Sequence, residues 1–180
     1  KKFFFVSCAI YCTAWSGNGN TGNSDGQDIP KVDDSQLAYH NPVIRIAAPD
    51  PTAMRAKDGY FYLYATEDIR NLPIFRSRDL VKWEEIGTAF TDETRPDFLP
   101  DNKDVKERAH LWAPEIRYVK GKYVLFYSLA QWGNHWVSTV GYAVSDSPEG
   151  PFTPKGKVFD SREVNVENSI DQYFYEEDGK

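Results

Sequence analysis

A short pattern of aromatic and aliphatic residues occurs twice in this chain with the same internal spacing. Residues 55–64 align without gaps on residues 117–126, with identical Arg, Gly and Leu residues and with aromatic residues at shared positions. Each copy places a Gly-centred turn between two stretches that lack a helical period, which is typical of a β-hairpin. A repeated β unit constrains the fold to a repeat architecture, because each unit buries its faces only against its neighbours.

A second, looser match completes the unit. Residues 75–87 resemble residues 142–156, and in both segments a large aromatic residue is followed four residues later by Gly. Each unit therefore holds about four strands, and we predict an all-β protein without an amphipathic helix. A third unit opens at Ile170–Asp171 and reaches Lys180 where its first hairpin should turn, so we expect the natural protein to continue beyond Lys180.

Composition agrees with a sheet protein and restricts the class of partner. Aromatic residues make up 15% of the chain, and the formal net charge is −6. Nucleic-acid binding needs a basic patch, and none is visible along the sequence, so we exclude a nucleic-acid partner. Neutral sugars are compatible with this charge.

The first 28 residues differ from the rest of the chain. Residues 1–16 have two Lys and then an apolar run too short to cross a bilayer, which predicts an export signal peptide. Residues 17–28 are rich in Gly, Asn and Ser and are predicted to be a flexible linker, so the folded part is expected over residues 29–180. Both cysteines lie in the predicted signal, which excludes a disulfide framework or a thiolate zinc site in the folded part. Cys12 is either the lipidated residue of a bacterial lipoprotein or an apolar thiol in a removed peptide.

Three motifs stand at comparable points of the repeated units. They are Pro49-Asp50-Pro51, Trp112-Ala113-Pro114-Glu115 and Asn168-Ser169-Ile170-Asp171. Together with the segment 141–152, which ends in Glu-Gly-Pro-Phe, their order resembles glycoside hydrolase family 43 over about residues 40–180. The resemblance implies a five-bladed β-propeller, of which this chain would cover the first two blades and the start of the third. It also implies hydrolysis of arabinose- or xylose-containing plant polysaccharides with inversion of configuration.

The resemblance assigns roles to two aspartates. Asp50 matches the general base, which activates a water for attack at the anomeric carbon; the alternative is that Asp50 and the following Pro only start a turn. Asp171 matches the second aspartate, which orients the acid and raises the acid's pKa by like-charge repulsion; the alternative is a surface Asp. Inverting glycosidases hold acid and base about 6.5–9.5 Å apart, and the inner strands of a propeller can supply that gap.

The general acid is expected outside this sequence. In the family it is a glutamate of a later blade, so residues 1–180 alone are expected to be inactive. Glu149 lies in a Glu-Gly-Pro run that imitates the usual surroundings of the acid, yet we predict that it is a turn residue at a blade edge. Glu115 takes a position that the family uses structurally, and it is kept as a second catalytic candidate.

Exposed aromatic side chains are the expected sugar-binding surface, because pentose rings stack their apolar faces on aromatic rings. Trp112 aligns without gaps on Asp50 in the repeat, so we assign Trp112 to the substrate cleft. Trp132 and Trp136 lie in a loop-like stretch between two strands, and at least one is predicted to form a subsite wall, with core packing as the alternative. Asn168, in the third motif, is also predicted to bind substrate.

No cofactor is identified, and no metal site is predicted because the histidines lack metal-ligand spacing. The family resemblance allows a structural Ca²⁺ on the propeller axis, for which no ligands are assigned.

The resemblance is greatest to the arabinan endo-1,5-α-L-arabinosidases. These endo-acting enzymes often carry His immediately before the Asp-Pro of the base, where this chain has Pro49, so an exo-acting arabinofuranosidase or a β-xylosidase remains an alternative. A propeller that binds glycan without cleaving it and a purely structural repeat domain are further alternatives. The expected partners are arabinan or arabinoxylan oligosaccharides, and the membrane is contacted only through a lipid anchor on Cys12. The expected location is bacterial: periplasmic, extracellular or, as a lipoprotein, in the outer membrane.

Overall fold

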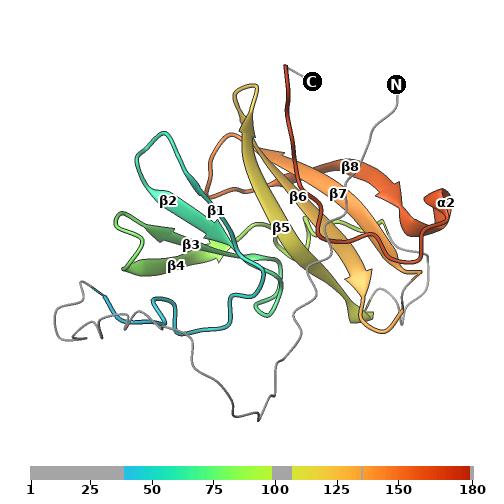
Figure 1. Cartoon of the computed structure of the whole chain (residues 1–180), viewed down its shortest axis with the longest axis horizontal. Helices are drawn as coiled ribbons and strands as arrows, with labels where there is room; N and C mark the ends of the chain where they lie inside the picture. Colours follow the sequence, from blue (N-terminus) through green and yellow to red (C-terminus); the bar gives the residue numbers. More distant parts are fainter. Residues whose placement is uncertain (1–38, 99–106, 135, 179–180) are drawn as a thin grey trace, which may run out of the picture. The chain divides into compact units, whose positions relative to one another are not determined.

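The computed structural model describes residues 39–98, 107–134 and 136–178. Within these ranges lie two four-stranded antiparallel sheets, each built from strands that follow one another in the sequence (Figure 1). Blade 1 contains β1 (Thr52–Arg55), β2 (Phe61–Tyr64), β3 (Pro73–Ser77) and β4 (Trp83–Thr88). Blade 2 contains β5 (Ala109–Val119), β6 (Lys122–Gln131), β7 (Ser138–Ser145) and β8 (Thr153–Asp160), and β8 is followed by the single-turn helix α2 (Ser161–Val164). Both blades belong to one compact unit, Asn41–Lys180.

The first strands of the two blades, β1 and β5, contact each other. After α2 the chain returns to blade 2, where the Phe174 ring stacks on Phe126 of β6 with ring centroids 5.6 Å apart. The prediction of two four-stranded blades and the start of a third is therefore confirmed.

A hydrophobic core joins the blades along their facing sides. Tyr64 of β2 meets Phe152 edge to face at 6.0 Å, and Phe90, which follows β4, meets Tyr127 of β6 in the same way at 5.5 Å. All four rings are almost fully buried. The N–H of Phe152 also donates to the carbonyl of Ala89 at 3.1 Å, so backbone and side chains fix one blade against the other.

Gly141 of β7 lies directly opposite Tyr127 of β6. A Cβ at this position would lie 2.8 Å from the Tyr127 ring and 2.9 Å from Phe98. Because carbon atoms in contact need about 3.5–4.0 Å, only Gly lets the large ring cross the sheet surface here.

The short helix α2 was not predicted from the sequence, although it is not amphipathic and leaves the all-β prediction intact. The Asp160 side chain caps it by accepting a hydrogen bond from the N–H of Arg162 at 2.9 Å, as short acidic caps do. Hydrogen bonding from the Arg162 side chain lowers the pKa of Asp160 to about 2. A single capped turn has no amphipathic period, so periodicity could not detect it.

The first hairpin is one residue longer than the second, although the sequence aligns them without a gap. Arg55 pairs with Phe61 in blade 1, whereas the counterpart of Phe61 in blade 2, Tyr123, pairs with Tyr118. The additional residue lies in the turn between β1 and β2. The gapless alignment therefore holds for the second strand of each hairpin and shifts by one residue along the first.

This shift corrects the predicted equivalence of Asp50 and Trp112. The residue that corresponds to Asp50 in blade 2 is Ala113, and both have left-handed backbones with φ of 47° and 39°. Asp171, at the start of the third unit, has φ of 58°. A left-handed residue thus stands just before β1 in blade 1, within β5 in blade 2 and at Asp171, and aspartate tolerates this conformation better than alanine does.

Candidate active site

Asp50 stands at the start of blade 1 with its side chain exposed. The Thr66 hydroxyl, just after β2, donates to Asp50 Oδ2 at 2.8 Å. The N–H of Thr66 donates to the carbonyl of Pro49 at 2.9 Å. Thr66 therefore holds both the backbone and the carboxylate of this turn.

Blade 2 is tied to the same threonine. The N–H of Ala113 donates to Thr66 Oγ1 at 2.7 Å, and the N–H of Glu67 donates to the carbonyl of Leu111 at 3.0 Å. The start of β5 is consequently fixed on both sides of Trp112.

Asp171 is placed by the residues around it. The side-chain amide of Gln172 donates to the carbonyl of Ala113 at 2.6 Å, and its oxygen accepts from the Ser128 hydroxyl at 2.7 Å. On the other side, the N–H of Ser169 donates to Ser138 Oγ at 2.9 Å. These three bonds join the third unit to blade 2 and set the backbone of Asp171.

The two aspartates share one electrostatic environment. Partial loss of water around Asp171 raises its pKa, and the negative charge of Asp50 raises it further. Residues far apart in the sequence are thus close enough for one carboxylate to oppose ionisation of the other. Within the described ranges, the Asp50 carboxylate accepts a hydrogen bond only from Thr66, and that of Asp171 accepts none, so both have oxygen atoms free to bind a water or a sugar.

A tryptophan pair, one ring half-buried and the other exposed, lies at this end of β5. Trp112 and Trp132 meet edge to face with ring centroids 5.9 Å apart, and Trp132 is 81% exposed. Core packing does not explain an exposed ring of this size, so the Trp132 ring is available to stack on the apolar face of a sugar. Trp136 is 46% exposed, and Asn168 is also exposed.

The comparisons with known proteins identify the family. The sequence model of glycosyl hydrolases family 43 matches residues 39–180. This chain belongs to family 43.

Relatives within family 43 differ in their activities. The chain is 31% identical to an extracellular endo-α-(1→5)-L-arabinanase of Thermotoga petrophila, over 71% of this chain and 28% of that protein. It is 30% identical to a xylan 1,3-β-xylosidase of Vibrio, over 63% of this chain and 21% of that protein.

The solved α-L-arabinanase of Cellvibrio cellulosa in complex with arabinohexaose matches the structure with a TM-score of 0.58 and 30% identity. The match covers 70% of this chain and 40% of that one. The chain therefore spans well under half the length of these relatives, and the fold class predicted from sequence, part of a five-bladed β-propeller, is confirmed.

Glu115, the second catalytic candidate, is buried and serves to join structural elements. Its carboxylate accepts from the Thr52 hydroxyl at 3.2 Å and pairs with Arg117 at 2.5 Å. Burial raises the pKa of Glu115 and outweighs the opposing effects of Arg117 and Thr52. A carboxyl enclosed in this way connects β1 with β5.

Glu149 lies in the turn between β7 and β8, as predicted. Its carboxylate pairs with Arg76 of blade 1 at 2.7 Å and accepts from the Tyr62 hydroxyl at 3.2 Å. Glu149 thus links the edges of the two blades.

The sequence analysis did not single out the buried pair Glu67 and Arg95. Arg95 makes two parallel hydrogen bonds to the Glu67 carboxylate, both 2.7 Å long, and the N–H groups of Leu111 and Asn71 donate to it at 2.7 and 2.9 Å. Burial acts to raise the pKa of Glu67, but these four donors together outweigh it and the pKa is lowered. An isolated Glu and a distant Arg carry no sequence signal that they will pair.

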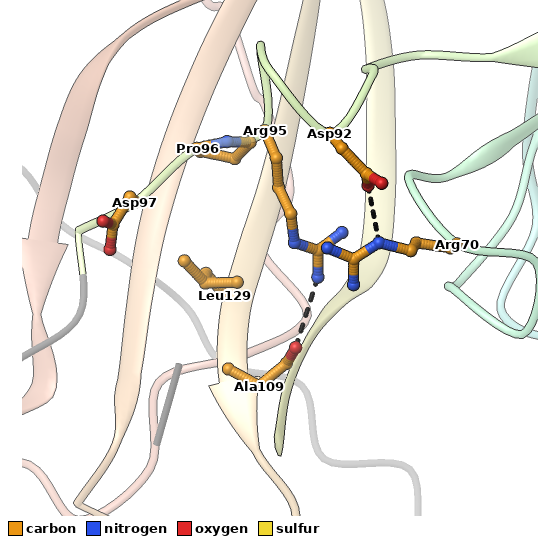
Figure 2. Close-up of a pocket in the computed structure, with 7 residues that line it drawn as sticks. All are labelled: Arg70, Asp92, Arg95, Pro96, Asp97, Ala109 and Leu129. Atoms are coloured by element: carbon orange, nitrogen blue, oxygen red, sulfur yellow. Dashed lines mark hydrogen bonds and ion pairs between the residues drawn. The ribbon is translucent and has the colours of Figure 1, made fainter. Parts of the chain in front are cut away.

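Arg95 also lines a pocket of about 190 Å³ (Figure 2). Its guanidinium donates to the carbonyl of Ala109 at 3.2 Å, and the neighbouring Arg70 pairs with Asp92 at 2.6 Å (Figure 2). The lining does not include Asp50 or Asp171. Because both guanidinium groups already have carboxylate partners, we interpret this hollow as part of the support for β5.

Several predictions fall outside what the structure describes. The export signal at residues 1–16, the linker at residues 17–28 and the lipidation of Cys12 lie outside the described residues. Among residues that are described, no helix is long and apolar enough to cross a membrane. The same residues contain no group of three or more His, Cys, Asp or Glu side chains that could hold a metal ion, so no Ca²⁺ ligands are assigned.

Proposed function

We propose that the whole protein is a glycoside hydrolase that cleaves α-L-arabinofuranosyl linkages in arabinan with inversion of configuration. Asp50 acts as the general base, and Asp171 raises the pKa of the general acid and orients it. The observation that carries this proposal is the pair of exposed, electrostatically coupled aspartates at the starts of two units.

The proposed mechanism follows from the free oxygen atoms of Asp50. A water bound there loses a proton to Asp50 as its oxygen attacks the anomeric carbon, while the acid protonates the departing glycosidic oxygen on the opposite side. Glu115 and Glu149 are engaged in links between elements. We therefore propose a glutamate of another blade as the acid.

The substrate follows from the tryptophan pair and from the relatives. Trp112 and Trp132 offer apolar ring surface next to Ala113, whose N–H is bonded to Thr66, and such a surface suits a neutral pentose chain better than a charged polymer. Relatives named as arabinanases favour arabinan, and the relative named as a xylosidase keeps a β-xylosidase as the second candidate.

We further propose that the protein is exported and meets arabinan or arabinoxylan oligosaccharides outside the cytoplasm. The support is the predicted export signal together with relatives that are named as extracellular enzymes. Attachment to a membrane through Cys12 is proposed on sequence grounds alone.

Trp132→Ala tests the proposed substrate site. Loss of one stacking surface, worth about 0.5–1.5 kcal/mol, should raise KM for linear arabinan by about 2- to 10-fold with little change in kcat or Tm. Trp136→Ala is the matched control, since Trp136 is in the same loop and the described residues give it no ring contact with Trp112. Equal effects of the two changes would contradict a specific role for Trp132.

The activity itself is tested with the whole protein on linear arabinan, arabinoxylan and xylan. Release of arabinose or arabino-oligosaccharides supports the proposal. Release of xylose alone would favour the second candidate, and binding without release of any sugar would show a glycan-binding propeller.

A further inference from the structure

The hydrogen-bond partners of Thr66 determine how its hydroxyl is oriented. A threonine hydroxyl has one hydrogen to donate and two lone pairs that accept. Because the N–H of Ala113 donates to Thr66 Oγ1 at 2.7 Å, this contact uses a lone pair and leaves the hydrogen for another partner. That partner is Asp50 Oδ2, 2.8 Å away.

We propose that Thr66 is a positioning residue that selects which oxygen of Asp50 acts as the base. The inference rests on the proposed function of Asp50. With Oδ2 engaged by the Thr66 hydroxyl, Oδ1 is the oxygen that remains open within the described part of the chain. The attacking water is therefore deprotonated by Asp50 Oδ1.

The same contacts connect the two aspartates. Ala113 is bonded at its N–H to Thr66 and at its carbonyl to Gln172, which directly follows Asp171. A continuous path thus runs from the Asp50 carboxylate through Thr66, Ala113 and Gln172 to the backbone of Asp171. The path crosses from blade 1 to blade 2 and then to the third unit. It therefore fixes the separation between Asp50 and Asp171, which no single strand could set.

The backbone of Ala113 is held in an unfavourable conformation by the hydrogen bonds of this path. Its left-handed φ of 39° is unfavourable for a residue with a Cβ and no polar side chain. The two hydrogen bonds of its peptide groups, 2.7 and 2.6 Å long, hold it there. Loss of the Thr66 hydroxyl frees one side of the Ala113 backbone as well as the Asp50 carboxylate.

Thr66→Val tests the proposal because valine keeps the shape and removes the hydroxyl. Misplacement of a reacting group by about 1 Å costs on the order of 10²-fold in rate, so we expect kcat to fall by about 10- to 100-fold while KM changes little. Thr66→Ser restores the hydroxyl and should restore most of kcat.

Thr139→Val is the matched control, since the Thr139 hydroxyl also donates to an aspartate, Asp160 Oδ2, at 3.0 Å within β7 and β8. This change removes a buried hydrogen bond away from the aspartate pair, so it should lower Tm and leave kcat unchanged. A purely structural role for Thr66 predicts the same outcome for both valine variants.

Full kcat in Thr66→Val, or failure of Thr66→Ser to recover kcat, would overturn the inference. A variant that raises KM at constant kcat would also overturn it, because Thr66 would then act in binding. If Asp50→Asn retains the wild-type rate or the wild-type protein is inactive, the proposed function fails and this inference fails with it. If Asp50→Asn is inactive and Thr66→Val is fully active, only the role of Thr66 is wrong.

Discussion

Asp50→Asn in the whole protein should lower kcat by about 10²- to 10⁴-fold, the usual contribution of a positioned general base. Asparagine has nearly the same shape and can still accept the Thr66 hydrogen bond, but it cannot take a proton from water at working pH. Substrate binding should therefore change little, which the KM and a direct binding measurement will show.

A second result is expected from the same variant without any activity measurement. The charge of Asp50 is one of the two causes that raise the pKa of Asp171, so removing the charge should lower the pKa of Asp171. Carboxyl carbon NMR of protein with labelled aspartate measures this shift. An unchanged pKa of Asp171 would contradict the convergence of the two aspartates.

Asp146→Asn is the matched control for this prediction. Asp146 pairs with Lys122 at an exposed site, where its side chain is 85% exposed, and exposed pairs contribute about 0–1 kcal/mol to stability. Its replacement should leave both kcat and the pKa of Asp171 unchanged. A wild-type rate in Asp50→Asn would show that Asp50 only starts a turn.

Asp171→Asn should lower kcat/KM by about 10²-fold and also change the pH profile. An ionised Asp171 beside the acid disfavours the ionised form of that acid and so raises its pKa. Removing this charge lowers the acid's pKa, and the alkaline limb of the kcat/KM profile should move to lower pH.

Two arabinosides separate this role from a general loss of structure. A substrate with a poor leaving group needs the acid, whereas one with a good leaving group needs it little. The variant should lose much more rate on the first substrate. An equal, small loss on both substrates with an unmoved alkaline limb would show that Asp171 is not the modulator.

The repeat made most of the fold predictable from the sequence. The hairpins of residues 55–64 and 117–126 form the first two strands of the two blades, and Asp171, where the third motif predicts a new unit, has a left-handed backbone like Asp50 and Ala113. The alignment of Asp50 with Trp112 was wrong because turn length depends on backbone geometry that matching residues do not reveal. The capped turn α2 was missed for a similar reason, since one turn shows no period.

The aspartates of the candidate site were found from motifs, but the groups that hold them were not. Thr66 and Gln172 act through hydrogen bonds between residues from different units, and a single threonine or glutamine is common in any sequence. Glu67 and Arg95 form a buried pair that supports β5, which the sequence likewise did not distinguish from surface charges. These contacts depend on how the blades pack, and packing is set by the whole fold.

The configuration of the first sugar released tests the central claim most directly. Two carboxyl groups that work on opposite sides of the anomeric carbon, with a water activated by Asp50, give inversion. Proton NMR recorded during hydrolysis of an α-L-arabinofuranoside by the whole protein should show the β anomer first, before mutarotation. An α anomer formed first would mean retention, and it would contradict the role of Asp50 as the base that activates water.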